Sequence, residues 1–383
     1  MIMFRFSRFF STYRQPRPHI DINSSLSILR DPNSYTTNTS SVIRALSDLG
    51  RSTQLYQNKN IEWSSKPEIV SASKSIPAII DNLDLESSVA LIKCCGQLGM
   101  DNNDLWNAIE RKIILKHYKT IKSSEASEIV TALQKLRKGS ARVWNCLEST
   151  IITKFCEKNE ITAKEATDIL VAYRKSEHGS EQLVQSLEQQ LIRNASQINS
   201  YDIWKIMLVY GQLNLGSDEF YARLETQIKA ICSTFNTLGA VITLDTYIRQ
   251  AKGSQELYQS LENEISHRLK AELNLENISS LMYTYAMNFT KESQNIENRK
   301  NFIKDLETIL CERYSSIAHE KARERDYNIG KCAWAISKLD MPTDLRLWNI
   351  IFKEMKEKGW ESNEKFIFFM REIKPYLKRN SLI

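Results

Sequence analysis

The stretch RKGSARVWNCLE, from Arg137 to Glu148, contains the elements that recur down this 383-residue chain. Gly-Ser stands at 139–140, 179–180, 216–217 and 253–254, and a Leu-Glu glutamate follows each Gly by nine residues. A phosphate-binding loop would need a pattern such as G-x-x-x-x-G-K-[ST] after a strand, and none of the four steps has it. Gly suits the left-handed position that ends a helix, and Ser suits the cap of the next helix. Each step therefore predicts a tight turn between two helices.

The glutamates set the register of a longer repeat. They are Glu110, Glu148, Glu188, Glu225, Glu262 and Glu307, spaced 38, 40, 37, 37 and 45 residues apart. Apolar residues stand four before, one before and three after the glutamate in all six copies, which is one face of an α-helix. A seventh copy, within 326–355, keeps its apolar positions with Trp348, Ile351 and Met355, and Phe352 replaces the glutamate.

A second helix is predicted before each Gly, for example over 124–138, 162–178 and 200–215. Thr162-Ala163-Lys164-Glu165 has the form of a capping box, and Asn199 or Ser200 suits the cap of the next copy. A helical pair of this size cannot bury its apolar faces alone, so successive pairs must stack. The sequence thus predicts an all-α fold, an α-solenoid of stacked antiparallel helical pairs with a 37–40-residue repeat.

Residues 1–10 have the composition of a mitochondrial transit peptide, with Arg5 and Arg8 among phenylalanines and no acidic residue. Arg8-Phe9-Phe10-Ser11 resembles a matrix-peptidase site, and cleavage after Phe10 would lower the formal net charge from +6 to +4. The alternative is a basic, disordered tail.

We expect a mitochondrial matrix protein, with a polar, partly ordered lead-in over 11–85, in which Ser41–Gly50 is a possible degenerate first helix. The solenoid is expected over 86–355, and a basic capping helix or tail over 356–383. No apolar run approaches the roughly 20 residues that span a bilayer.

One segment carries a family resemblance. Asn328–Leu339 (NIGKCAWAISKL), followed by Leu345–Trp348, resembles the N-x-x-x-x-A-W-A-x-x-K-L helix of octotricopeptide and heptatricopeptide repeats, with weaker matches at Ser88–Gly99 and Glu128–Leu136. These organellar proteins are similar to the FAST-kinase-like RNA regulators. The resemblance covers roughly 86–355 and implies RNA binding in an organelle or a place in the mitochondrial ribosome. The C-terminal RAP domain of many members is not expected here.

No residue set indicates catalysis, a metal, a cofactor or a small-molecule substrate, so we expect a protein that is not an enzyme. The seven cysteines contain no C-x-x-C and are expected to be mainly buried, reduced thiols. The five histidines lack the spacing of a metal site or of a catalytic triad. The glutamates lie one repeat apart, so each is expected to contact a neighbouring helix rather than to form an acid–base pair.

Basic residues recur where the first helix of a pair ends. The predicted RNA-binding ladder comprises Lys135, Arg137, Lys138, Arg174, Lys175, Arg249 and Lys252, and Gln212 and Leu215 interrupt it. Residues four and one before the Gly are expected to share a helix face and to follow a phosphate backbone. The alternative is that these cations only complement the helix dipole.

A C-terminal basic patch comprises Lys365, Arg371, Lys374, Lys378 and Arg379. The neighbouring Phe366, Phe368 and Phe369 are expected to pack on the last repeat or to dock a partner. The leading functional prediction is RNA binding in mitochondrial gene expression, as a transcript factor or a ribosome constituent. The rival is a structural or assembly subunit with protein partners in a mitochondrial complex such as a respiratory complex, favoured by the modest net charge.

Overall fold

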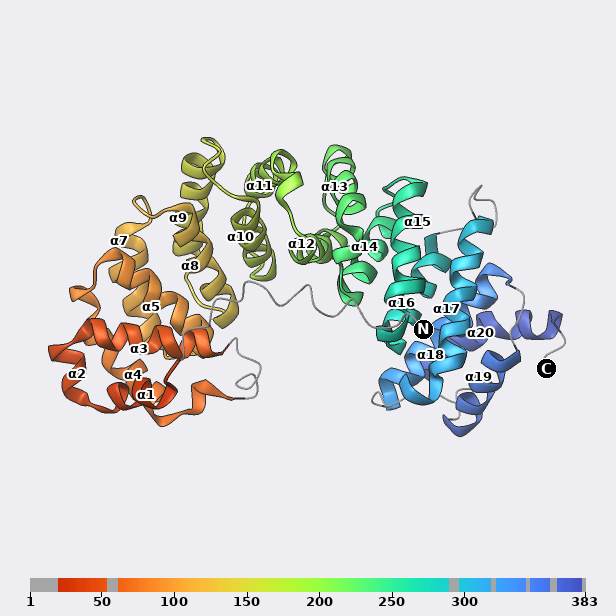
Figure 1. The fold of residues 1–383 in the computed structure, drawn as a ribbon, viewed down its shortest axis with the longest axis horizontal. Helices are drawn as coiled ribbons and strands as arrows, with labels where there is room; N and C mark the ends of the chain where they lie inside the picture. Colours follow the sequence, from red (N-terminus) through yellow and green to blue (C-terminus); the bar gives the residue numbers. More distant parts are fainter. Residues whose placement is uncertain are drawn as a thin grey trace, which may run out of the picture. The chain divides into compact units, whose positions relative to one another are not determined.

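The computed structural model describes residues 20–53, 61–288, 296–317, 322–341, 345–358 and 364–380. These residues form helices joined by short loops, and no strand occurs among them. The chain is an all-α solenoid of antiparallel helical pairs (Figure 1), so the predicted fold class is confirmed. The predicted transit peptide, residues 1–10, lies outside the described residues.

The helical pairs follow the predicted register. Their first helices are α5 (Leu85–Leu98), α8 (Ser123–Leu136), α10 (Ala163–Lys175), α12 (Ser200–Leu213), α14 (Thr237–Arg249), α16 (Leu275–Asn288) and α18 (Ala322–Leu339). Their second helices are α6 (Asn103–Ile109), α9 (Ala141–Thr150), α11 (Glu181–Arg193), α13 (Asp218–Ile231), α15 (Gln255–Asn263), α17 (Ile296–Ile317) and α19 (Leu345–Lys358). Three second helices continue into π-helical turns, at Glu110–Ile114, Ile151–Cys156 and Glu264–Arg268, and α7 (Leu115–His117) follows the first of these turns.

Further helices precede and follow these pairs. They are α1 (Ile22–Arg30), α2 (Pro32–Thr37), α3 (Thr39–Ser52), α4 (Pro67–Ser75) and α20 (Glu364–Arg379). The segment Ser41–Gly50, expected as a degenerate first helix, lies within α3, which packs beside α5.

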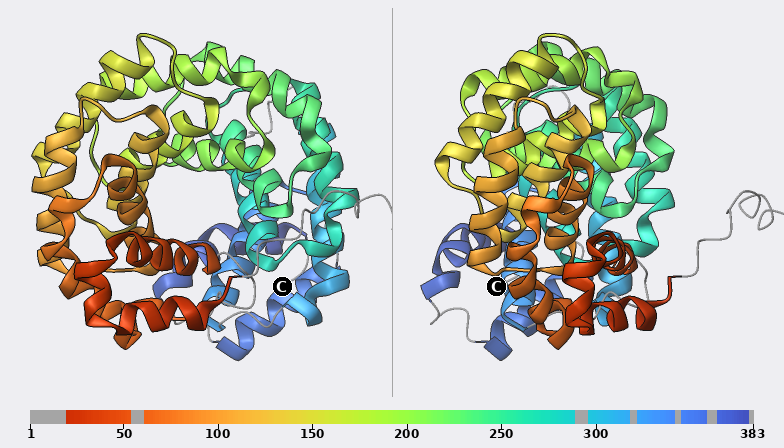
Figure 2. Two further views of the ribbon diagram at one scale, coloured as in Figure 1. Left: turned by 60° about the vertical axis from the view of Figure 1, so that its left-hand side comes forward. Right: turned by 90° about the vertical axis from the view of Figure 1, so that its left-hand side faces the viewer.

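The chain divides into two compact units. Unit 1 comprises Met1–Ile161 and Ala172–Val184, and unit 2 comprises Thr162–Val171 and Gln185–Ile383. In unit 1, α1, α3, α5 and α8 follow one another as neighbours. In unit 2, α12, α14, α16, α18 and α20 do the same, and α13 and α15 pack in a second layer (Figure 2). Each layer buries the apolar stripes of the other.

The core follows the sequence pattern. The predicted apolar positions around all six glutamates are buried, from Trp106, Ile109 and Ile113 in the first copy to Ile303, Leu306 and Leu310 in the sixth. Burying a side chain of this size contributes about 1.5–3 kcal/mol, so these positions carry much of the packing between repeats.

The helix starts are capped as the sequence predicts. The backbone N–H of Thr162 donates to the Glu165 carboxylate at 2.9 Å, and the N–H of Glu165 donates to the Thr162 hydroxyl at 3.2 Å, which completes the capping box. At α12 the cap is Asn199, whose side chain accepts from the N–H of Asp202 at 2.9 Å.

The first helices end earlier than expected. The residue after the last turn of α8 is Arg137, which has φ +53°, and the N–H of Lys138 donates to the Leu133 carbonyl at 2.9 Å. Glu177, Asn214 and Ala251 take the same left-handed conformation in the later copies. The helices therefore end three or four residues before the Gly, and the left-handed residue of the Schellman motif stands two residues before it. Our expectation that the Gly itself ends the helix is wrong.

The Gly has a different role, in the turn that follows. Gly139 and Gly216 have φ values of +92° and +104°, which L side chains rarely adopt. A Cβ on Gly216 would also stand 2.7 Å from the Tyr221 ring and 2.9 Å from the Tyr210 ring. Gly is required here by both conformation and space, and the next residue then caps the second helix.

Candidate nucleic-acid interface

The aligned glutamates hold the turn of the next pair. The carboxylates of four of the six accept the backbone N–H of the turn serine one repeat further on, in the contacts Glu110–Ser140 at 3.0 Å, Glu148–Ser180 at 3.0 Å, Glu188–Ser217 at 3.1 Å and Glu225–Ser254 at 3.0 Å. The Ser140 and Ser254 hydroxyls donate to the same carboxylates. The expected polar contact to a neighbouring helix is thus confirmed, and these glutamates are engaged in repeat packing.

Buried tyrosines strengthen these contacts in unit 2. The Tyr210 hydroxyl donates to Glu188 at 3.2 Å, and the Tyr285 hydroxyl donates to Glu262. Burial raises the pKa of Glu262, against the opposing effects of the Tyr285 hydrogen bond and the Arg299 charge. Burial also raises the pKa of Tyr285, and the Glu262 charge adds to this shift. Both effects are those of polar groups enclosed between helices.

Part of the predicted basic ladder is folded back onto the protein. Because α8 ends at Leu136 and α14 at Arg249, Lys138 and Lys252 lie beyond the helices, in the turn. Lys138 pairs with Asp101 and donates to Asn103 at 2.8 Å, and Lys252 pairs with Asp218. Asn103 and Asp218 are the first residues of the second helices in the preceding pairs. The expectation that residues four and one before the Gly share a helix face is wrong.

The ladder residues on the helices also differ among themselves. The Lys135 ammonium group donates to the Gln97 carbonyl at 3.4 Å, and burial lowers its pKa. Arg249 pairs with Asp245 at 3.0 Å, four residues before it in α14. Arg174 is half-buried, and within the described part of the chain its Nε has no hydrogen-bond partner. These three side chains therefore do not form one uniform track.

Three ladder residues meet at one place in unit 1. The α8–α10 hollow has a volume of about 570 Å³ and is lined by Gln134, Arg137, Lys138, Gly139, Trp144, Lys175, Ser176, Glu177 and His178. Its lining has three cationic side chains and one carboxylate, that of Glu177, and one of the cations, Lys138, is paired with Asp101. Arg137 and Lys175 are exposed, and no ion pair of either is found among the described residues. Buried Trp144 forms part of the wall and stacks on His178 with 4.8 Å between ring centroids.

The C-terminal basic patch lies mainly on α20. Arg371, Lys374, Lys378 and Arg379 are exposed there, and Arg379 pairs with Asp340 at 3.3 Å. The side chain of Lys365 lies outside those the structure describes. Phe369 is buried and its ring stands 5.8 Å from that of Tyr327, so it packs on α18.

The sequence reasoning missed Lys338, at the end of α18. It stands two residues before Asp340, which has φ +53°, just as Lys135, Lys175 and Arg249 stand two residues before their own left-handed residues. The pair Lys338-Leu339 repeats Lys135-Leu136, and this signal could have identified it. Because no Gly-Ser step follows α18, the alignment on the Gly-Ser steps did not include Lys338.

A second set of cations caps the other end of the repeats. Lys154 donates to the Ile121 carbonyl at 2.6 Å, Arg268 to the Phe235 carbonyl at 2.6 Å and Arg313 to the Leu273 carbonyl at 3.0 Å. Each stands six residues after its glutamate. Each donates to a backbone carbonyl in the loop that joins the preceding helical pair to the next first helix. These cations have a structural role, because their hydrogen bonds go to backbone carbonyl groups of the chain itself.

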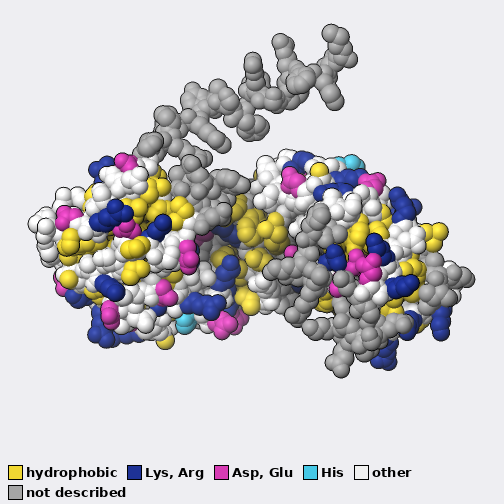
Figure 3. Space-filling view, turned by 90° about the horizontal axis from the view of Figure 1, so that it is seen from below, with side chains coloured by type: hydrophobic (Ala, Val, Ile, Leu, Met, Phe, Trp, Pro, Cys, Tyr) yellow, Lys and Arg dark blue, Asp and Glu magenta, His cyan; other side chains and the backbone are white. Residues whose placement is uncertain are grey.

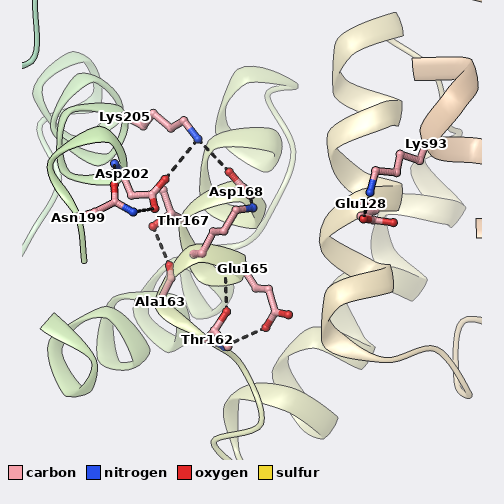
Figure 4. A network of polar contacts seen from close by, with 11 residues as sticks. Lys93, Glu128, Thr162, Ala163, Glu165, Thr167, Asp168, Asn199, Asp202 and Lys205 are labelled. Atoms are coloured by element: carbon pink, nitrogen blue, oxygen red, sulfur yellow. Dashed lines mark hydrogen bonds and ion pairs between the residues drawn. The ribbon is translucent and has the colours of Figure 1, made fainter. Parts of the chain in front are cut away.

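Charges on the faces of the first helices are also paired. In unit 2, Lys205 lies 3.2 Å from Asp168 and 3.4 Å from Asp202, and in unit 1 Lys93 pairs with Glu128 (Figure 4). On the face drawn in Figure 3, lysines and arginines stand singly or in small groups among acidic and apolar side chains. The lining of the α8–α10 hollow, by contrast, brings three cationic side chains together with one carboxylate.

The described residues place limits on other sites. They contain no cluster of three or more His, Cys, Asp or Glu side chains that could hold a metal ion, and no helix among them is long and apolar enough to cross a membrane. The cysteines form no disulfide in the described part of the chain, and they are buried at 94, 95, 156, 232 and 332 and half-buried at 146 and 311. Comparison with protein-family models and with the curated proteins found no match.

Proposed function

We propose that this chain is an RNA-binding helical-repeat protein that acts in mitochondrial gene expression, as a transcript factor or as a constituent of the mitochondrial ribosome. The observation that supports RNA binding is the α8–α10 hollow, where Arg137 and Lys175 are exposed and show no ion pair among the described residues, while the third cation of the lining, Lys138, pairs with Asp101. Arginine and lysine are the side chains that neutralise backbone phosphates, and arginine binds them with two parallel hydrogen bonds. The mitochondrial location rests on the composition of residues 1–10.

The proposed activity is binding rather than catalysis. The carboxylates that recur in the sequence are held by turn serines and tyrosines of the neighbouring pair. Arg137, the C-cap residue of α8, and Lys175, in the last turn of α10, can both complement a helix dipole. Their meeting at one open hollow, without an ion pair for either among the described residues, is what favours a ligand.

The test measures binding of the chain from Ser11 onward to single-stranded mitochondrial RNA across a range of salt concentrations. Each phosphate neutralised on a single strand contributes a slope of about −0.7 to the plot of log affinity against log salt concentration. The variant Arg137→Asn/Lys175→Ala should flatten this slope by about 0.7 to 1.4. Asn is chosen at position 137 because it tolerates the left-handed conformation.

The matched control is Lys116→Ala/Lys158→Ala, which also removes two exposed charges from unit 1, away from the hollow. It should leave the slope close to that of the unmodified protein. Equal slopes for the hollow variant and the control would show that the hollow is not the phosphate site.

One observation favours the rival function. Tyr201 and Leu238 are 58% and 48% exposed, and both are the second residue of their helices, the neighbours α12 and α14. Exposed apolar side chains at matched positions suit a protein partner. Sedimentation of a mitochondrial lysate separates the two functions. Migration with ribosomal subunits that nuclease abolishes supports the RNA function, whereas migration with a respiratory complex supports the rival.

A further inference from the structure

We propose that unit 2 carries a second phosphate-binding site, at a hollow between α18 and α20. The α18–α20 hollow has a volume of about 440 Å³ and is lined by Ser337, Lys338, Arg371, Glu372, Pro375 and Arg379. The inference rests on the proposed RNA function and deepens it, because it names a separate place where the chain holds the phosphate groups of RNA.

The charge of this hollow suits an oxyanion. Three cationic side chains face one carboxylate, that of Glu372, which is the same balance as in the α8–α10 hollow. Arg379 has Asp340 as a partner at 3.3 Å, and its side chain remains 61% exposed. Lys338 and Arg371 are exposed, and the described residues show no ion pair for either. A phosphate entering the hollow would thus meet two cations without displacing a carboxylate.

The position of Lys338 in the repeat supports the same conclusion. Lys338 and Lys175 each stand two residues before a left-handed residue, Asp340 or Glu177, so they occupy equivalent places at the ends of their first helices. The α18–α20 hollow is built from the end of α18 and the C-terminal half of α20, which follows α18 as its neighbour in unit 2. Both hollows thus use a lysine from the end of a first helix, Lys175 from the later helix of its hollow and Lys338 from the earlier one.

The side chains are suited to different parts of a phosphate. Arg371 offers a planar guanidinium that can donate two parallel hydrogen bonds to two phosphate oxygens, and Lys338 offers a mobile point charge. Tyr376 is buried between the helices, and its hydroxyl donates to the Met341 carbonyl at 2.7 Å. This hydrogen bond holds α20 against the end of α18, so both cations are presented by helices that are packed together.

The experiment compares the unmodified chain from Ser11 onward with the variant Lys338→Gln/Arg371→Gln. The glutamines keep the length and polarity of the side chains and remove both charges. For each phosphate that the variant no longer neutralises, RNA affinity should fall about fivefold at 0.1 M salt, and the salt slope should flatten by about 0.7. The control is Lys353→Gln/Lys356→Gln, which removes two exposed charges from α19 and should change neither quantity. Circular dichroism checks that each variant is folded.

A second arm uses inorganic pyrophosphate, which offers the same oxyanion without a nucleic acid. It should slow amide exchange in α18 and α20 of the unmodified protein and of the α19 control, and slow it less in the hollow variant.

The outcomes separate this inference from the proposed function. If the α8–α10 variant weakens RNA binding and the α18–α20 variant behaves as its control, the inference is overturned and the proposed function stands. If the unmodified protein shows no salt-dependent RNA binding, the proposed function fails and with it the RNA ligand named here. Pyrophosphate stabilisation that is equal in the hollow variant and the control would show that the hollow is not an oxyanion site.

Discussion

At the scale of single residues, two neighbouring positions in each turn are left-handed for different reasons. Ala251 has φ +51°, two residues before Gly253, and follows the end of α14. The turn glycines have φ values near +90° to +104°, and a Cβ atom there would be too close to neighbouring side chains. The left-handed helical conformation costs an L residue roughly 1–2 kcal/mol. This cost is tolerated at Ala251 because the Schellman hydrogen bond from Lys252 to the Tyr247 carbonyl at 3.0 Å depends on it.

The substitution Gly216→Ala should lower the free energy of unfolding by about 2–4 kcal/mol, since conformational strain adds to overlap with Tyr210 and Tyr221. Ala251→Gly should raise it by no more than about 1 kcal/mol, because relief of strain is opposed by the entropy of glycine in the unfolded chain. Chemical denaturation measures both. Equal destabilisation by the two substitutions would contradict this account of the turn.

At the scale of the helical pair, the contact between a glutamate and the next turn serine sets how successive pairs meet. The glutamate lies beside the apolar stripe of a second helix, and it reaches the N–H at the start of the following second helix. A carboxylate near a helix N-terminus also interacts favourably with the helix dipole. The contact between glutamate and serine therefore fixes the register of successive pairs, caps the second helix and stabilises the repeats electrostatically.

The substitution Glu225→Ala should lower the free energy of unfolding by about 1–2 kcal/mol, because the Ser254 N–H and hydroxyl lose a charged acceptor. Glu225→Gln should cost less, since an amide oxygen can still accept the N–H. Denaturant titration of the two variants gives the comparison. A Gln variant as unstable as the Ala variant would indicate that charge, rather than the hydrogen bond, sustains the contact.

At the scale of the whole molecule, the repeats follow one another with contacts mainly between neighbours, and the chain divides into two compact units. Stability in such an array is close to a sum of repeat and interface contributions, so local opening need not spread along the chain. Unfolding is then not a single two-state event, and one melting temperature does not describe it.

Hydrogen exchange tests this independence. Gly216→Ala should speed amide exchange in α12, α13 and α14 of unit 2 and leave the amides of α5 in unit 1 at their original rates. A uniform increase across both units would show that the chain opens as one cooperative body.

The sequence by itself determined the fold class, the register and the buried residues of this protein, because a helical pair leaves a periodic apolar stripe and its caps in the local sequence. The stripe at Trp144, Leu147 and Ile151 and the capping box at Thr162–Glu165 are examples. Only the tertiary structure decided which cations stay open to a ligand. Lys138 and Lys175 are both lysines shortly before a Gly-Ser step, yet Lys138 pairs with Asp101, 37 residues earlier, while Lys175 remains exposed. The Lys338-Leu339 pair, which repeats Lys135-Leu136, could have placed Lys338 in register from the sequence, and the backbone conformation of Asp340 establishes that register. The physical reason is that a charge is neutralised by whatever the fold brings near it, and this depends on distances between repeats that no local pattern records.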